Sequence, residues 1–225
     1  MNFFYEIAPN MKQLGGELWN CTGQTLQMVV VSAVFAFVIG TLVGVLLTVT
    51  KRGGIMECVP VYTVIDKAID ILRSIPFIIL IFLLIPLTRL IVGTSLGVTG
   101  AYVPLIVGTV PFYGRQIEQV LAEVDGGLIE ASEAMGRSPV SIIFSVYLRE
   151  SIPSITRVSM ITLVSLVGLT AMAGAVGAGG LGDFAIRYGY QLGYNDALWI
   201  TVIIILAIIS IIQITGNIII RKTTH

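Results

Sequence analysis

The sequence predicts an all-α integral membrane protein with five transmembrane helices. Hydrophobic residues make up 56% of the 225 residues and charged residues only 12%, and the mean hydropathy is +0.94. Long uncharged stretches recur along the chain, and the basic residues gather in the segments between them. These proportions lie outside the range of soluble domains. Thirteen basic and thirteen acidic residues balance, so no overall field attracts nucleic acid, and the lipid bilayer is the first expected partner.

We assign five membrane spans within a single domain over residues 1–225. The spans are 26–49, 60–88, 98–118, 155–177 and 197–220. Residues 26–49, 158–182 and 197–220 contain no charged side chain, and each is long enough to cross a hydrocarbon core of about 30 Å as a helix. The second span enters through an amphipathic stretch at 59–73. In the first span, Gly40 and Gly44 have the spacing that lets another helix approach closely, although scattered glycines would look the same.

The basic residues predict the orientation of the chain. Five spans place the two termini on opposite sides of the membrane. With the N-terminus outside, ten of the thirteen basic residues fall in cytoplasmic segments and only Lys12, Arg89 and Arg187 lie outside. Cytoplasmic segments are enriched in Lys and Arg, so we expect an outer N-terminus and a cytoplasmic C-terminus. Cys21 and Cys58 flank the first span, too far apart to form a disulfide.

The cytoplasmic loop at about 125–150, between the third and fourth spans, is expected to form two short helices at an angle. Asp125-Gly126-Gly127 is read as a turn, and Glu130 to Met135 are mostly good helix formers. Gly136 suits the left-handed position after a helix end, and Ser138-Pro139 supplies the cap and first residue of the next helix.

The second of these helices has one apolar face. Its members recur at three- and four-residue spacing: Ile142, Ile143, Val146 and Tyr147. Such a face needs a partner, which could be lipid headgroups, the protein's own spans or another protein.

This loop resembles the EAA loop of ABC importer permeases, usually written E-A-A-x3-G-x9-I-x-L-P. Here it reads Glu130-Ala131-Ser132, three residues, Gly136, nine residues, Val146-Tyr147-Leu148. Ser132 replaces the second alanine and Arg149 the final proline. The resemblance implies the ABC type I importer fold, with a coupling helix that docks on a separate ATPase subunit. The implied interface residues are Glu130, Ala131, Ser132, Gly136, Arg137 and Ser138. A surface helix-turn-helix is the plainer alternative.

Three further runs resemble the methionine branch of these permeases: 73–80, 85–95 and 172–183 followed by 186–190. The resemblance implies a homodimer with two ATP-binding subunits, a substrate-binding lipoprotein outside the cell, and a place in the bacterial inner membrane. The sequence has no G-x-x-x-x-G-K-[ST] motif, so we expect ATP and Mg²⁺ on the partner ATPase. This chain itself is expected to be no enzyme, with no catalytic residue, metal site or cofactor.

The stretch Gly177 to Gly182, GAGGLG, has the G-x-G-x-x-G spacing of dinucleotide-binding loops. That motif needs a preceding strand, whereas this run follows an apolar helix near the outer face, so we do not expect a nucleotide there. The glycines are expected to end the fourth helix. By resemblance, Met172 just before them lines the translocation path at its gate; filling a packing gap is the alternative.

Residues 183–196 are expected to form an outer loop with three tyrosines. Arg187, Tyr188 and Tyr190 are candidates for docking the binding protein, because tyrosine and arginine are favoured in interfaces. An aromatic belt at the membrane boundary explains the tyrosines equally well.

Three other functions are weighed against methionine import. The cargo could be another amino acid or a small metabolite. An ion-coupled secondary carrier would place ionisable groups inside its spans, and most of these spans have uncharged centres. An intramembrane enzyme would need convergent His, Asp, Glu or Cys side chains, and the chain has one histidine, at its last position.

Overall fold

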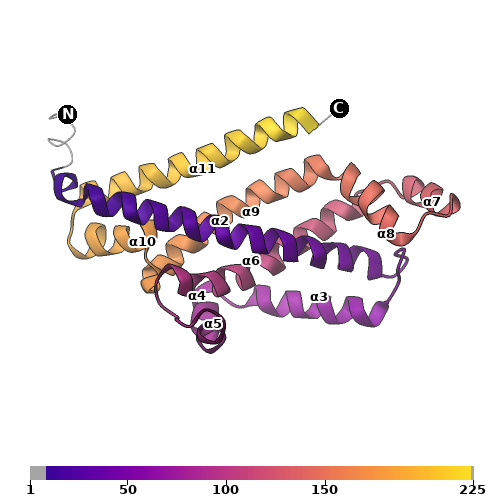
Figure 1. The fold of residues 1–225 in the computed structure, drawn as a ribbon, viewed down its shortest axis with the longest axis horizontal. Helices are drawn as coiled ribbons and strands as arrows, with labels where there is room; N and C mark the ends of the chain where they lie inside the picture. Colours follow the sequence, from indigo (N-terminus) through magenta and orange to yellow (C-terminus); the bar gives the residue numbers. More distant parts are fainter. Residues whose placement is uncertain (1–8, 224–225) are drawn as a thin grey trace. The chain divides into compact units, whose positions relative to one another are not determined.

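The computed structural model describes residues 9–223, and within that range every regular element is a helix and there are no strands (Figure 1). The elements are α2 (Met11–Thr50), α3 (Val59–Ser74), α4 (Phe77–Leu83), α5 (Ile85–Val92), α6 (Gly97–Ala122), α7 (Gly126–Ala134), α8 (Pro139–Ile142), η1 (Ile143–Leu148), α9 (Ile152–Ala173), η2 (Gly174–Ala178), α10 (Gly180–Phe184), η3 (Ala185–Gln191) and α11 (Asn195–Thr223). The expectation of an all-α protein is confirmed.

Three of the described helices are long and apolar enough to cross a membrane. They are Met11–Thr50, Ile152–Ala178 and Asn195–Lys222, which contain the predicted first, fourth and fifth spans. The pair Ile85–Val92 and Gly97–Ala122 together pass the same test but are bent by 118°, and α6 covers the predicted third span. The helix α2 begins at Met11, well before the predicted start at Leu26. The predicted first span is therefore the later part of a longer helix.

Prolines divide the predicted second span into three helices. The range 60–88 contains α3 without its first residue, all of α4 and half of α5, not one continuous helix. Ile75 precedes Pro76 and is extended, with φ −84° and ψ 122°, because a residue before proline is pushed out of the helical region. Pro86 stands in the first turn of α5, where its missing N–H costs nothing.

The chain forms two compact units. Of the described residues, the first, called unit 1, comprises 9–34, Pro76–Ile106 and Leu163–Gln213. The second, called unit 2, comprises Phe35–Ile75, Val107–Thr162 and 214–223. The long helices contribute one segment to each, so each unit is built from chain segments far apart in the sequence.

The core of unit 1 joins the start of α2 to α10 and α11. Its buried members are Met11, Leu18, Cys21, Leu181, Phe184 and Ala197. At its edge, the side-chain amide of Asn10 donates to Asp196 at 2.9 Å, and the backbone N–H of Asn10 donates to the same carboxylate at 3.0 Å. These bonds hold the first turn of α2 against the first turn of α11.

The core of unit 2 depends on a close approach of α2 and α6. A Cβ added at Gly40 would lie 2.8 Å from Tyr113 Cδ1, and one at Gly44 would lie 2.6 Å from Ile117 Cβ. Side chains larger than hydrogen therefore do not fit at either position. The Gly40-x-x-x-Gly44 spacing thus serves helix packing, which the sequence had left open.

Candidate functional site

The segment 125–150, named the coupling segment below after the role that the resemblance implies, lies in unit 2 and begins with a capped helix. The Asp125 side chain accepts a hydrogen bond of 2.8 Å from the Gly127 backbone N–H and caps α7. Gly126 and Gly127 are therefore the first residues of the helix, and the predicted turn at 125–127 is wrong. An aspartate cap satisfies N–H groups that a helix start leaves free, and this allows two glycines to begin a helix.

A Schellman motif ends α7, as the glycine predicted. The Gly136 N–H donates to the Glu133 carbonyl at 2.8 Å, and the Arg137 N–H donates to the Ser132 carbonyl at 3.2 Å. Gly136 has φ +73°, a conformation that L side chains adopt only with strain. The bend between the two helices is therefore set by this glycine.

The second part of the coupling segment packs on α6. Ser138 caps α8 by accepting from the Ser141 N–H at 3.3 Å, and Pro139 follows it in the first turn; both were predicted. The apolar face inserts its three most buried side chains among Tyr113, Ile117 and Leu121 of α6; these are Ile142, Val146 and Tyr147. The partner of this face is thus the protein's own helix. Burial, with a further contribution from the Glu133 carboxylate, raises the pKa of Tyr147 above its usual value.

Most of the predicted interface residues are accessible. Glu130, Ala131, Gly136, Arg137 and Ser138 are exposed. Ser132 is not: it is 5% exposed, and its hydroxyl donates to the Leu128 carbonyl at 2.8 Å. Ser132 therefore turns toward the protein and cannot contribute a large contact area to a partner.

The sequence reading missed four large apolar side chains that the coupling segment leaves exposed. They are Leu128, Met135, Val140 and Phe144, with exposed fractions of 47, 66, 58 and 68%. In helices that belong to neither the core nor a span, such side chains are typical of a protein interface. The helical phase could have revealed Phe144, because it lies off the face that carries Ile142 and Val146.

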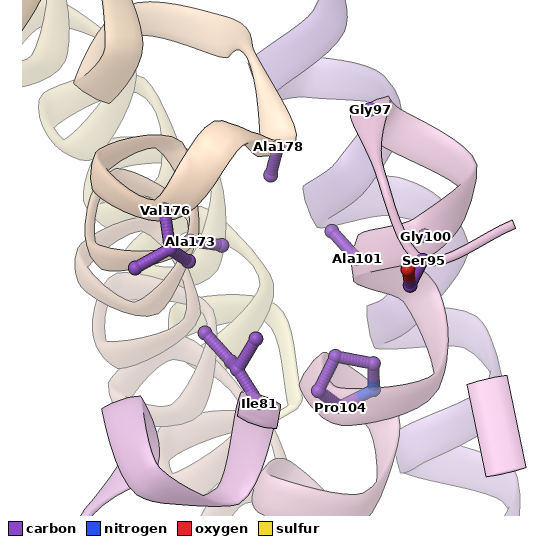
Figure 2. A pocket seen from close by; sticks show the side chains of 9 residues that line it. All are labelled: Ile81, Ser95, Gly97, Gly100, Ala101, Pro104, Ala173, Val176 and Ala178. Atoms are coloured by element: carbon purple, nitrogen blue, oxygen red, sulfur yellow. The ribbon is translucent and has the colours of Figure 1, made fainter. Parts of the chain in front are cut away.

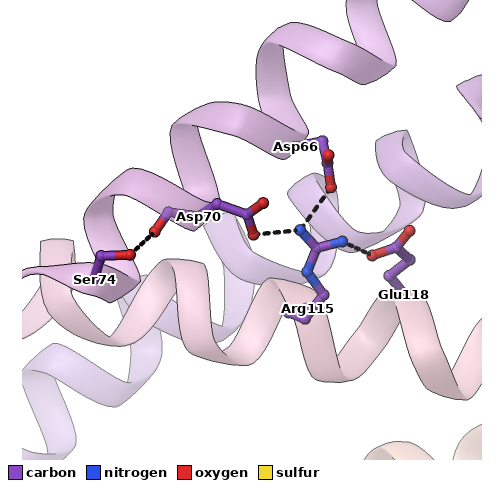
Figure 3. A network of polar contacts seen from close by, with 5 residues as sticks. All are labelled: Asp66, Asp70, Ser74, Arg115 and Glu118. Atoms are coloured by element: carbon purple, nitrogen blue, oxygen red, sulfur yellow. Dashed lines mark hydrogen bonds and ion pairs between the residues drawn. The ribbon is translucent and has the colours of Figure 1, made fainter.

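The opposite side of α6 carries an ionic network that binds α3 (Figure 3). Arg115 donates to Asp66 at 2.7 Å and to Asp70 at 3.1 Å, both on α3, and to Glu118 on its own helix at 2.7 Å. Arg115, Asp66 and Glu118 are each exposed by 20% or less, whereas Asp70 is 52% exposed. Tyr113 and Arg115 are two positions apart and therefore lie on different sides of α6. Tyr113 contacts the coupling segment, and Arg115 holds α3.

The glycine run after α9 breaks the helix and then starts another. α9 ends at Ala173, and Val176 (φ −112°) and Gly177 (φ +93°) are not helical. The chain resumes as α10 and η3, up to Gln191. Residues 183–191 are thus helical, which corrects the predicted loop at 183–196. Met172, the proposed gate residue, lies one position before the end of α9 and is 41% exposed.

A small hollow of about 20 Å³, enough for about one water molecule, lies beside the break in unit 1 (Figure 2). Ala173, Val176 and Ala178 line one side, and the other residues come from α4, the start of α6 and the turn before it: Ile81, Ser95, Gly97, Gly100, Ala101 and Pro104. Nearly all of these side chains are small or apolar, so the hollow offers few polar groups to bind a ligand.

The three proposed docking residues have different environments. Arg187 pairs with Asp183 and with Glu17, the latter at 3.5 Å; desolvation lowers the pKa of Arg187, but the Asp183 carboxylate outweighs it and raises that pKa. Tyr188 packs on the core of unit 1, its ring 4.9 Å from that of Phe184. Tyr190 is 83% exposed. Of the three, Tyr190 has the largest free surface.

Comparison with known proteins gives a consistent set of relatives. The family model "Binding-protein-dependent transport system inner membrane component" matches residues 40–224. A probable D-methionine transport system permease protein MetI from Vibrio cholerae is 43% identical over 208 residues, 92% of each chain. The methionine import system permease protein MetP from Bacillus subtilis is 45% identical over 216 residues, 96% of each chain.

Solved structures agree with these sequences. A chain of the MetNI methionine ABC transporter in an inward-facing conformation has a TM-score of 0.89 and 45% identity, covering 92% of this chain and 96% of its own. An amino acid ABC transporter solved with histidines has a TM-score of 0.77 at 16% identity, which shows a shared fold only.

Proposed function

Because the chain belongs to the family of inner membrane components of binding-protein-dependent transport systems, we propose that it is the permease subunit of an ATP-driven ABC importer for methionine. The observation that carries the proposal is the match to the MetNI transporter, at 45% identity over nearly the whole of both chains. Two relatives named for methionine transport, from Vibrio cholerae and Bacillus subtilis, support the same cargo.

Energy for transport comes from a partner. The chain has no P-loop motif, and the N–H groups of Gly180 and Leu181 in the glycine run are already occupied by side chains of α2. ATP and Mg²⁺ are held by two ATPase subunits, which bind two copies of this permease. The complex lies in the inner membrane of a bacterium and takes methionine from a binding protein outside the cell. Each permease crosses the membrane five times, with its N-terminus outside.

The coupling segment is the docking site for the ATPase. Its exposed apolar side chains, Leu128, Met135, Val140 and Phe144, supply contact area, while Glu130, Ala131, Gly136, Arg137 and Ser138 lie beside them. Ser132 supports the helix from inside. Because Ile142, Val146 and Tyr147 are buried against α6, a displacement of the segment by the ATPase moves α6 with it. Packed side chains transmit such displacements since cores are dense and poorly compressible.

Met172 closes the translocation path against its copy in the second permease. Its exposure of 41% in the single chain and the break in α9 that follows it support this assignment. On the outer side, Tyr190 is the main contact for the binding protein, with Arg187 and Tyr188 fixing the helix that presents it.

Paired serine substitutions test the docking surface. Phe144→Ser removes an exposed apolar side chain from the coupling segment, and Leu96→Ser removes one of the same exposure, 68%, between α5 and α6. We expect Phe144→Ser to lower copurification of the ATPase and methionine uptake by cells auxotrophic for methionine. Leu96→Ser should leave both unchanged. Equal behaviour of the two variants would overturn the docking assignment.

A further inference from the structure

The N-terminus of α10 is capped by side chains from another helix. Gln24 and Thr25 of α2 both take part: the Gly180 N–H donates to Gln24 Oε1 at 2.8 Å, and the Leu181 N–H donates to Thr25 Oγ1 at 2.8 Å. Gly179, the residue in the capping position, has no side chain to do this. The first N–H groups of any helix lack partners within the helix, so α2 supplies acceptors that the local sequence lacks.

The contact admits only glycine at two positions of the run. Gly179 and Gly180 have φ +80° and +79°. A Cβ at Gly179 would lie 2.7 Å from Gln24 Oε1, and one at Gly180 would lie 2.7 Å from Thr25 Oγ1. The glycines therefore let the backbone come within hydrogen-bond reach of both acceptors.

The ends of the broken stretch are fixed by close packing as well. A Cβ at Gly182 would lie 2.2 Å from the Ala171 carbonyl oxygen, and one at Gly174 would lie 2.6 Å from the Asp183 N. The start of α10 thus lies directly against the end of α9. Between these fixed points Gly177 has nothing within 4 Å of its added Cβ, and Val176 lines the hollow of unit 1 (Figure 2).

We propose that Gln24 and Thr25 are positioning residues for transport: by capping α10 they hold the glycine hinge, Gly174 to Gly180, in a defined conformation beside the path. The inference rests on the proposed transport function and does not require Met172 to be the gate. Thr25 is 3% exposed, and the hydrogen bond that it accepts from the Leu181 N–H is buried, so loss of the acceptor leaves a buried donor unpaired. Without these acceptors, the hinge opens more often.

The test compares isosteric changes one turn apart on α2. Thr25→Val removes the acceptor, and Thr25→Ser keeps it. Thr22→Val is the matched control, because Thr22 is also buried but its hydroxyl donates to the Leu18 carbonyl of its own helix, at 2.7 Å. Gln24→Met removes the second acceptor and should act in the same direction.

Hinge opening is measured in the complete transporter, purified with its ATPase and placed in lipid nanodiscs. Val176→Cys reports on the hinge through its rate of reaction with a maleimide, after Cys58→Ser has removed the exposed native thiol. We expect Thr25→Val to raise this rate about tenfold, which corresponds to about 1.4 kcal/mol. In liposomes, where transport can be measured, the same variant should lower methionine uptake per ATP hydrolysed. Thr25→Ser and Thr22→Val should match the parent.

Each outcome is decisive. If Thr25→Val reacts at the rate of Thr22→Val, the positioning role is wrong. If the labelling rate rises but wild-type protein takes up no methionine, the cap holds the hinge and the proposed cargo is what fails. If uptake per ATP is unchanged while labelling rises, the hinge does not serve transport and the proposal is overturned.

Discussion

Replacing Gly44 by alanine should separate α2 from α6 and lower the stability of the permease. The new Cβ would lie 2.6 Å from Ile117 Cβ and 2.7 Å from the Gly114 carbonyl oxygen, whereas carbon atoms pack at about 3.5 to 4.0 Å. The helices must move apart by roughly 1 Å, and overpacking of this kind costs about 1 to 3 kcal/mol. Better helix propensity returns about 0.5 to 1 kcal/mol. The expected net loss therefore lies between about 0 and 2.5 kcal/mol, and about 1 to 2 kcal/mol is the middle of that range.

The assay is thermal unfolding of the purified permease in detergent, followed by tryptophan fluorescence. For a chain of this length, the net loss corresponds to a fall in Tm of roughly 2 to 8 °C. Gly16→Ala is the control, since Gly16 lies in the same helix and an added Cβ there meets nothing within 4 Å. That variant should keep or slightly raise Tm. If Gly44→Ala and Gly16→Ala shift Tm in the same direction, the reasoning from close packing is refuted.

Three other predictions concern unit 2. Arg115→Met leaves the carboxylates that it binds unpaired and should lower the free energy of unfolding by about 2 to 4 kcal/mol. Asp70→Asn changes an exposed partner and should lower the free energy of unfolding by about 1 kcal/mol or less. Thermal midpoints that rank the two variants the other way contradict the burial argument. Gly136→Ala should lower the free energy of unfolding by about 1 to 2 kcal/mol and reduce copurification of the ATPase. Gly126→Ala should do neither, because an added Cβ there also meets nothing within 4 Å and Gly126 does not have a positive φ. Tyr147→Phe should hardly change the free energy of unfolding at pH 7. Because the folded-state pKa of Tyr147 is raised, wild type should lose stability relative to the Tyr147→Phe variant as pH rises above about 10.

Local features of the coupling segment were predictable because neighbours in sequence decide them. Gly136 needs positive φ whatever surrounds it, and Ser138 caps the helix that Pro139 begins. The wrong prediction at Asp125 is also a local one. An aspartate can cap a helix or begin a turn, and the two glycines after it favoured the turn. Ser132 is buried because of its position around the helix, and the EAA motif does not show which of its residues face the protein.

Contacts between distant segments could not be predicted. Gln24 and Thr25 lie 156 positions from the N–H groups they cap, and no pattern in α2 marks them as acceptors. The Arg115 network joins residues 45 and 49 positions apart whose charges looked like ordinary cytoplasmic ones. The glycine run was read correctly as a helix end, but the helix after it begins at Gly180 with N–H groups that are capped from α2, a contact that the local sequence does not contain.

Transport by a reconstituted system tests the central claim most directly. The permease, with its ATPase, would be placed in liposomes that enclose ATP and Mg²⁺, and the binding protein and labelled methionine would be added outside. We predict accumulation of methionine that requires enclosed ATP and is competed by unlabelled methionine but not by histidine or glutamate. ATP-dependent accumulation of a different amino acid without methionine, or methionine uptake driven by an ion gradient in the absence of ATP, would contradict it.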